Sequence, residues 1–308
     1  MRPLRIGTRG SLLARWQANF VRSRLFEVSG VDAEIVVIKT SADKFAQVPP
    51  GALGLKGVFI KELEEALASG EIDLAVHSAK DVPTETAPGL AFPAVCRRDD
   101  VRDCLVSHPS ATLAALRQGA RVGTSSLRRQ AQLRRLRPGL DVRELRGNLD
   151  TRLRKVESGE YQAVIVAKAG LDRLGWSERI SEVLEPDVWL PAVGQGALAV
   201  ESGSGNQRAV EIAGRLDDEE TRWAVVAERA LLAELHGGCQ VPVGAWARLE
   251  HKQLVMDACV VSLDGTQFVR ARGASPLEDA AKLGSNLAQR LISEGAGDIL
   301  TQLGRKFE

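Results

Sequence analysis

The chain has 308 residues, of which 44% are hydrophobic and 26% are charged, with a formal net charge of +1. These values are typical of a globular protein of two or three domains, and neither a signal peptide nor a membrane-spanning apolar run is found, so we expect a cytoplasmic protein. Its four cysteines and four histidines form no C-x-x-C or H-x-x-x-H pair, which argues against a zinc site. Aromatic residues make up only 4% of the chain, which disfavours a stacking platform for single-stranded nucleic acid.

The first hundred residues alternate short apolar segments with amphipathic ones, which predicts strands and helices in turn. In the first helix Leu13, Trp16 and Phe20 recur at helical spacing, so we expect them to lie on one face. The last strand places Ser78-Ala79-Lys80-Asp81 at its carboxyl end, the edge where open α/β sheets bind ligands. The expected elements are strands over 4–7, 33–39 and 72–77, helices over 12–27 and 58–68, and a loop over 41–57.

Residues 121–155 form a basic stretch with eleven Lys or Arg and three Asp or Glu, a local net charge of +8. Such runs usually form the solvated faces of surface helices. Here Val122-Gly123-Thr124-Ser125-Ser126 predicts a strand end, a turn and a hydroxyl N-cap, which aim backbone N–H groups at an anion. Arg128 and Arg129 follow in the first turns of that helix, and Arg outnumbers Lys by ten to one in the stretch. Because Arg suits two-pronged binding of carboxylates or phosphates, we expect an anion site.

The rest of the chain predicts a second α/β unit and then a small α+β domain. Arg146-Gly147-Asn148 repeats the order of strand, glycine and helix, and directs Arg146 and Arg152 toward the same edge. Two such units predict two lobes with an anion cleft between them. The expected elements are strands over 104–107, 121–123, 142–146, 163–167, 197–201, 241–249, 254–262 and 267–273, helices over 149–158, 218–235, 276–293 and 297–303, and a flexible turn over 202–206.

Cys239 differs from the other three cysteines in its local sequence. Cys96, Cys104 and Cys259 lie in apolar segments, as expected of inert, buried thiols. Cys239 follows Gly237-Gly238, which would expose its sulfur on a loop, and His236 is the only nearby candidate for a base. A displayed thiol without a base suits a covalent attachment point better than a turnover nucleophile.

Five separated segments carry a more specific signal. They are His77-Ser78-Ala79-Lys80-Asp81-Val82-Pro83, Val122-Gly123-Thr124-Ser125-Ser126-Leu127-Arg128-Arg129-Gln130, Leu145-Arg146-Gly147-Asn148, Ala192-Val193-Gly194-Gln195-Gly196-Ala197 and Gly237-Gly238-Cys239. In order and spacing, and over nearly the whole chain, they resemble the porphobilinogen deaminase family, also called hydroxymethylbilane synthases. Two segments in the expected loop, around Ala42 and Leu55, depart from the family pattern. They lie in the loop that would cover the cleft and not at Asp81, Cys239 or the arginines, so we expect activity to survive.

The resemblance implies a fold and a reaction. It implies two α/β lobes similar to type II periplasmic binding proteins, the first from residues 1–98 and 194–216 and the second from 99–193, and a C-terminal α+β domain with a three-stranded sheet over 217–308. It further implies a dipyrromethane cofactor held by a thioether to Cys239. On this primer the enzyme would join four porphobilinogen molecules with release of ammonia, and release 1-hydroxymethylbilane for tetrapyrrole, porphyrin and haem biosynthesis. A monomer without a nucleic-acid or membrane partner is implied as well.

The resemblance also implies site residues. Asp81 matches the catalytic carboxylate, which would stabilise cationic intermediates and carry protons from ring to amine; alone, it could equally cap a helix or pair with Lys80. Lys56, Phe59 and Gln195 would lie at the substrate pocket or its lid. The carboxylates of cofactor and substrate would be bound by Arg9, Ser11, Lys80, Arg128, Arg129, Arg146 and Arg152, helped by Thr124, Ser125 and Ser126.

Two other classes of function compete with this one. A non-catalytic, bilobal anion-binding protein would explain the two lobes and the arginines, but neither the third domain nor Gly237-Gly238-Cys239. A nucleic-acid-binding protein would show affinity that falls steeply with salt, and we expect little such binding.

Overall fold

The computed structural model describes residues 2–38, 60–236 and 241–304. They form two compact units, one made of Met1–Asp99 with Ala197–Arg222 and the other of Asp100–Gly196 with Trp223–Glu308. The chain therefore leaves the first unit after Asp99 and returns to it at Ala197. The three-domain boundaries expected from the sequence stay a prediction.

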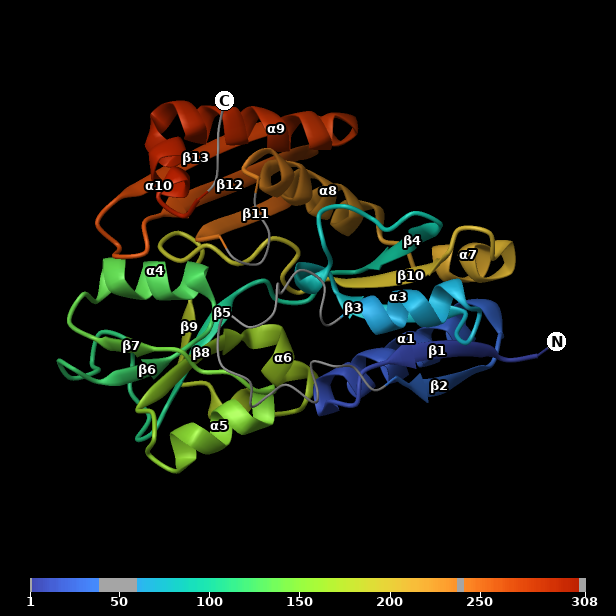
Figure 1. The fold of residues 1–308 in the computed structure, drawn as a ribbon, viewed down its shortest axis with the longest axis horizontal. Helices are drawn as coiled ribbons and strands as arrows, with labels where there is room; N and C mark the ends of the chain where they lie inside the picture. The colour runs from blue at the N-terminus through green and yellow to red at the C-terminus, as the bar shows by residue number, and fades with distance from the viewer. Residues whose placement is uncertain (1, 39–59, 237–240, 305–308) are drawn as a thin grey trace. The chain divides into compact units, whose positions relative to one another are not determined.

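The first unit is built on a five-stranded sheet in the order β2-β1-β3-β10-β4. The strands β1, β2 and β3 are parallel, and β10 runs antiparallel to both β3 and β4. The return segment thus supplies an inner strand of this sheet. The strands are β1 (Leu4–Thr8), β2 (Ala33–Val37), β3 (Leu74–Ser78), β4 (Leu90–Cys96) and β10 (Leu198–Gly203) (Figure 1).

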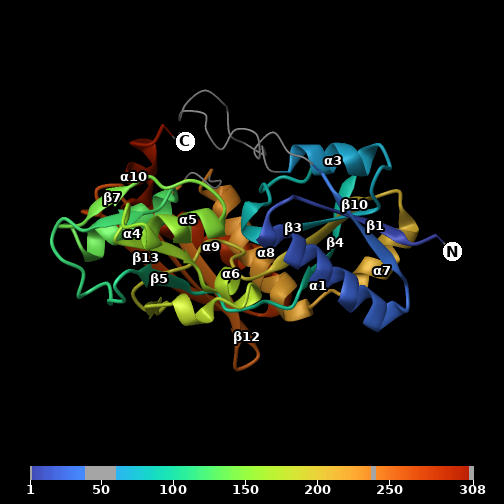
Figure 2. The same cartoon turned by 90° about the horizontal axis from the view of Figure 1, so that it is seen from below.

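Helices cover both faces of this sheet. The helices α1 (Leu12–Ser29) and α7 (Gln207–Gly214) pack on one face, and α3 (Lys61–Ala68) packs on the other (Figure 2). Because successive residues of a strand point to opposite faces, Leu74 and Val76 of β3 join the core under α1 and α7, whereas Ala75 joins the core under α3.

Two of the three residues that we expected on one face of α1 do lie together, since Phe20 stacks on Trp16 at 5.4 Å between ring centroids. This face is not the buried one, because Phe20 is 37% exposed and the helix buries Gln17, Ala18, Val21 and Leu25. The helix carries apolar residues on more than one side, and the small Ala18 and the polar Gln17 sit against the sheet.

The second unit contains two sheets. The first has the strand order β7-β6-β8-β5-β9, with β6, β7 and β8 parallel and β5 antiparallel to β8 and β9. Its cores lie under α4 (Leu127–Leu136) on one face and under α5 (Leu149–Glu157) and α6 (Lys168–Arg173) on the other. The strands are β5 (Asp103–Ser107), β6 (Arg121–Gly123), β7 (Asp141–Arg143), β8 (Ala163–Ala167) and β9 (Glu182–Leu184) (Figure 1).

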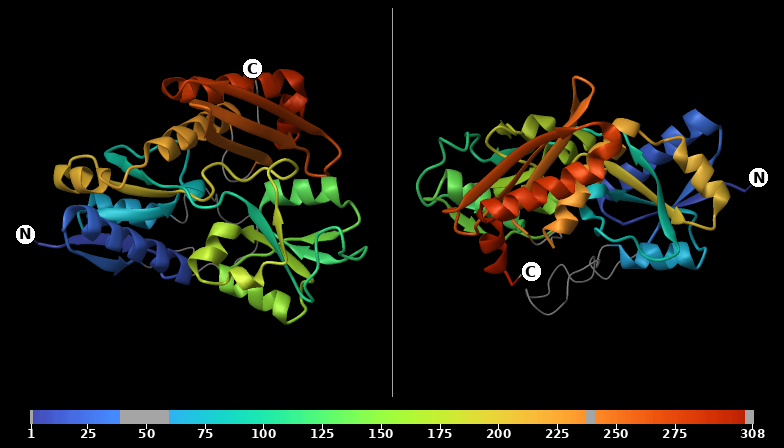
Figure 3. Two further views of the ribbon diagram at one scale, coloured as in Figure 1. Left: turned by 180° about the vertical axis from the view of Figure 1, so that it is seen from behind. Right: turned by 90° about the horizontal axis from the view of Figure 1, so that it is seen from above.

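The other sheet of this unit is an antiparallel meander of β11 (Val243–Glu250), β12 (Gln253–Val261) and β13 (Phe268–Ser275). One face packs against α8 (Glu219–Glu234) and α9 (Ala280–Leu291), followed by α10 (Gly297–Thr301) (Figure 3). The helices α8 and α9 approach each other so closely that a Cβ on Gly284 of α9 would lie 2.1 Å from the carbonyl oxygen of Ala227 of α8. The opposite face contacts α4 through a small core that contains Ala131 and Cys259.

The predicted fold class is confirmed, since the chain forms two α/β sheets and a three-stranded antiparallel sheet with helices. Most predicted strands and helices are found within a few residues of their expected bounds. The sequence analysis missed β4, β9, α6 and α7, and the turn expected over 202–206 was wrong at its start, because β10 continues to Gly203. Asn206 then caps α7 by accepting a hydrogen bond from the Ala209 amide.

Candidate active site

In the first unit, the predicted site residues follow two neighbouring parallel strands. Arg9 and Ser11 come after β1, and Lys80 and Asp81 come after β3. Carboxyl ends of parallel strands meet at one edge of a sheet, so these residues share that edge. The Ser11 hydroxyl caps α1 by accepting a hydrogen bond from the Ala14 amide at 3.3 Å.

Asp81 ends a single turn of 3-10 helix, Ala79–Asp81, that begins directly at the end of β3. The Ala79 amide still donates to the carbonyl oxygen of Ala197 at 3.0 Å, so the turn begins from a strand that is paired to its last residue. The Asp81 side chain is exposed and Lys80 is half-buried. The turn therefore presents a carboxylate and an ammonium group at the carboxyl edge of the sheet.

In the second unit, three parallel strands end at one edge of their sheet. After β6 the chain forms the turn through Thr124 and Ser125 and enters α4 at the N-cap Ser126, whose hydroxyl accepts from the Arg129 amide at 3.4 Å. After β7 it enters α5 at Asn148, which makes no side-chain capping hydrogen bond. The N-termini of two helices and the start of α6 after β8 thus lie at one edge, an arrangement that favours anions.

The remaining arginines predicted for this edge flank the start of α5. Arg146 is exposed, and its Nε lies 2.6 Å from a carboxylate oxygen of Glu144. Arg152 is half-buried and donates from Nε to the carbonyl oxygen of Gly147 at 2.9 Å. Both side chains hold short local contacts and remain accessible at the surface of the unit.

Arg128 and Arg129 are placed differently, because they are only 3% and 6% exposed. Their guanidinium groups lie 2.8 and 2.7 Å from the two carboxylate oxygens of Asp103, which is fully buried at the start of β5. The same carboxylate accepts hydrogen bonds from Trp189 Nε1 at 2.7 Å and from Gln195 Nε2 at 2.8 Å. We call these five residues the Asp103 cluster.

The Asp103 cluster carries more positive than negative charge. Burial would raise the pKa of Asp103, but Arg128 and Arg129 outweigh burial and hold that pKa well below its usual range. One carboxylate faces two guanidinium groups, and the Nε atoms of both arginines have no hydrogen-bond partner within the described part of the chain. Such an excess of buried positive charge favours an anionic group nearby.

Other arginines of the basic stretch hold the fold together. Arg134 donates to the carbonyl oxygen of Leu263 at 2.6 Å, and the Arg135 guanidinium lies 3.8 Å from the ring centroid of Phe268, so both tie α4 to the β12–β13 hairpin. Arg137 donates to the carbonyl oxygens of Leu113 and Leu116. The net charge of +8 therefore overstates how much of the stretch can meet a ligand.

Three predicted site residues, Lys56, Phe59 and Cys239, lie outside the described residues. Among those described, Thr124 is fully buried, and Gln195, predicted at the substrate pocket, is 1% exposed and donates to Val101 and Asp103. The sequence analysis missed Asp103, which has no motif around it. Only the unusual density of arginines that need a counter-ion could have indicated such a residue.

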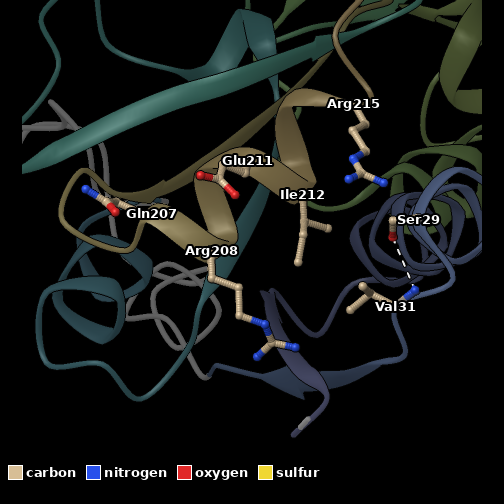
Figure 4. Close-up of a pocket in the computed structure, with 7 residues that line it drawn as sticks. All are labelled: Ser29, Val31, Gln207, Arg208, Glu211, Ile212 and Arg215. Carbon is tan, nitrogen blue, oxygen red and sulfur yellow. Dashed lines mark hydrogen bonds between the residues drawn. The ribbon is translucent and has the colours of Figure 1, made fainter.

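The surface pocket drawn in Figure 4 is separate from these residues. It has a volume of about 410 Å³ and lies where α1 ends and α7 runs past it, with Ser29, Arg208 and Arg215 among its lining residues. Because Ser29 and Val31 precede β2, the pocket is at the amino end of the parallel strands. It therefore lies opposite the edge that holds Arg9, Lys80 and Asp81.

Within residues 2–38, 60–236 and 241–304, no helix is long and apolar enough to span a membrane. Nor do these parts of the chain hold a group of three or more His, Cys, Asp or Glu side chains that could bind a metal ion.

Comparison with known proteins gives a consistent family. Residues 4–211 match the model of the porphobilinogen deaminase dipyromethane cofactor binding domain, and residues 223–293 match that of the porphobilinogen deaminase C-terminal domain. A porphobilinogen deaminase from Syntrophotalea carbinolica is 48% identical over 301 residues, which cover 97% of this chain and 96% of the relative. One from Geobacter sulfurreducens is 46% identical over 301 residues, covering 97% and 94%.

Similar solved structures include the methionine binding protein MetQ, with 12% identity and a TM-score of 0.44, covering 69% of this chain and 89% of that one.

Proposed function

This chain belongs to the porphobilinogen deaminase family, and from this premise we propose how its own residues carry out the family's reaction. The enzyme is a transferase that joins four porphobilinogen molecules head to tail with release of ammonia, and releases 1-hydroxymethylbilane by hydrolysis in tetrapyrrole biosynthesis. Its dipyrromethane cofactor supplies the primer on which the chain of pyrroles grows.

Asp81 is the proposed catalytic residue. The observation that carries this proposal is its place on the turn after β3, where an exposed carboxylate shares one sheet edge with Arg9, Ser11 and Lys80. A carboxylate there stabilises positive charge that develops on the pyrroles, and its oxygens can take a proton from carbon and return it to the departing amine. Lys80, beside it, suits an acidic side chain of the substrate.

The other proposed contacts are with carboxylates, because every porphobilinogen carries an acetate and a propionate. Each addition therefore brings two negative charges. In the second unit, Ser125, Ser126, Arg146 and Arg152 lie at the edge where α4 and α5 begin, and the excess positive charge of the Asp103 cluster lies behind that edge. This arrangement supports a role in holding the carboxylates of cofactor and substrate, with Arg128, Arg129 and Thr124 acting from buried positions.

Three further parts of the proposal rest on the family resemblance. Cys239 is the proposed attachment residue for dipyrromethane. Gln195, Lys56 and Phe59 are the proposed residues of the substrate pocket and its lid. We also propose a cytoplasmic monomer with the three domains expected from the sequence, which light scattering and cell fractionation test.

Intact-protein mass spectrometry of the freshly purified enzyme tests the attachment. We expect a mass above the sequence value by one dipyrromethane, absent in Cys239→Ser and retained in Cys259→Ser, whose thiol is buried. An adduct that survives in Cys239→Ser would refute the attachment residue. Asp81→Ala should keep the adduct and lose chain elongation, and normal product formation by that variant would refute the catalytic role.

A further inference from the structure

The carboxyl end of β3 is held from both faces of its sheet. On the α1 face, Gln17 Nε2 donates to the Ser78 hydroxyl at 2.9 Å. On the α3 face, His77 Nε2 lies 2.9 Å from Glu201 Oε2 of the neighbouring strand β10. These two contacts occupy the last two residues of β3, immediately before the turn that presents Lys80 and Asp81.

The contact on the α3 face lies in a dry environment. His77 is 5% exposed and Glu201 is fully buried. Burying a carboxylate is costly unless it has a hydrogen-bonding partner, and His77 is the group that contacts this carboxylate. The second oxygen of Glu201 makes no hydrogen bond within the described part of the chain. Among these residues, the contact with His77 is therefore the one that fixes the position of the carboxylate.

The surrounding elements confine the pair further. Phe92 of β4 meets the His77 ring edge-on at 6.3 Å between ring centroids. From α3, Glu64 faces the pair, and its pKa is raised by burial and then by the charge of Glu201. The neighbours of His77 thus include the carboxyl group of Glu64 and the ring of Phe92, and these restrict rotation of the imidazole.

We propose that the His77–Glu201 and Gln17–Ser78 contacts act as a two-sided clamp that positions Asp81 for the reaction. The proposal rests on the catalytic role proposed for Asp81. Two of the clamp residues, His77 and Ser78, precede Asp81 by four and three positions, and a single tight turn lies between them and Asp81. A shift of the strand end is therefore transmitted to the carboxylate, and a displacement of about 1 Å can lower the rate about 100-fold. His77, Glu201 and Gln17 are positioning residues in this scheme.

The opposite end of β3 supplies a matched control. Asp73, which directly precedes the strand, is 3% exposed and accepts hydrogen bonds from the Arg5 amide and guanidinium and from Arg2. The strand β3 is thus held near each of its ends by a buried carboxylate, Asp73 at the start and Glu201 at the end. Of the two, only Glu201 contacts the part of the strand that precedes the turn with Asp81.

The first test compares Glu201→Gln with Asp73→Asn in the holoenzyme. Both variants should lower the midpoint of thermal unfolding, because each removes a buried charge from its partner. Only Glu201→Gln should lower kcat for porphobilinogen, by about 100-fold with little change in KM, while kcat of Asp73→Asn stays near wild type. Equal kcat values in the two variants would overturn the proposal. Mass spectrometry verifies that both retain dipyrromethane.

The second test adds Glu201→Gln to Asp81→Asn. If Glu201 acts through Asp81, the residual kcat of Asp81→Asn should not fall further, although the loss of thermal stability should remain. A full additional loss of kcat would mean that Glu201 acts independently, and would overturn the clamp. A kcat near that of the wild type in Asp81→Asn alone would instead overturn the catalytic role of Asp81, so the two failures are distinguishable.

Ser78→Ala provides a milder variant should Glu201→Gln not fold. It removes one part-buried hydrogen bond from the other side of the clamp and leaves His77 and Glu201 in place. We expect kcat to fall about fivefold, the rate equivalent of one such bond. An unchanged kcat in this variant would also overturn the proposal.

Discussion

The helices α4 and α5 begin alike in sequence but use their arginines in different ways. Each follows a short parallel strand and a glycine, and each starts at a residue that can cap a helix. In α4 the N-cap Ser126 bonds the Arg129 amide, and Arg128 and Arg129 are buried against Asp103. In α5 Asn148 makes no such cap, and the neighbouring Arg146 is exposed.

The arginines of α4 and those near the start of α5 therefore have different roles, which a count of charges over residues 121–155 does not distinguish. The arginines of α4 hold the start of β5 and the segment through Trp189 and Gln195 in place, so they shape the edge of the sheet. The start of α5 has no side-chain cap, and Arg146 beside it is exposed. A basic stretch can therefore be largely structural and still keep a few arginines at the surface, where we propose that they bind carboxylates.

The largest effect is expected from Asp103→Asn. Loss of the carboxylate charge leaves two guanidinium groups buried without compensation, which should cost about 3–5 kcal/mol of unfolding free energy. Urea unfolding followed by tryptophan fluorescence measures this loss. Asp150→Asn is the control on α5, where Asp150 pairs with the exposed Arg154 at 3.0 Å, and it should cost less than about 1 kcal/mol. Similar losses in both variants would contradict the comparison.

An intermediate effect is expected from Arg146→Leu, and it should appear in activity rather than stability. Loss of a charged hydrogen bond to a substrate carboxylate should lower kcat/KM for porphobilinogen by about tenfold. Arg143→Leu is the control, because Arg143, the last residue of β7, is also exposed and pairs with an acid, Asp141. Steady-state assays measure kcat/KM of both variants. A normal kcat/KM in Arg146→Leu would show that Arg146 does not bind a substrate carboxylate.

The smallest effect concerns the two helix starts themselves. Ser126→Ala removes a capping hydrogen bond and should cost about 1 kcal/mol. Asn148→Ala removes no such bond and should cost less than about 0.5 kcal/mol, since the usual penalty comes from the missing bond. Chemical denaturation of the two variants compares these costs. A larger loss for Asn148→Ala would show that its side chain stabilises α5 in another way.

The sequence allowed the strands that carry the site motifs to be predicted, because Gly and hydroxyl residues mark where each strand ends and each helix begins. It did not allow β4 to be predicted, because Pro93 lies within it and proline is unfavourable in most strands. The strand tolerates Pro93 because it is at the edge of the sheet and its pairing with β10 is irregular beside that residue.

The Asp103 cluster could not have been predicted from local patterns either. Asp103 lies 25 and 26 residues before its arginine partners and 86 residues before Trp189. Nothing in the neighbouring sequence distinguishes it from the exposed acids. The sequence indicated which arginines belong to the family pattern, but whether each meets a ligand or a buried carboxylate is decided by tertiary packing.

The inner position of β10 has a consequence for how the protein is made. Residues 198–203 pair with β3 on one side and β4 on the other, so these two strands have no common neighbour until the ribosome has synthesised the whole α/β part of the second unit. His77 likewise lacks Glu201 during that interval. The sheet of the first unit therefore cannot be completed before residues 198–203 have been synthesised, which places its closure late in biosynthesis.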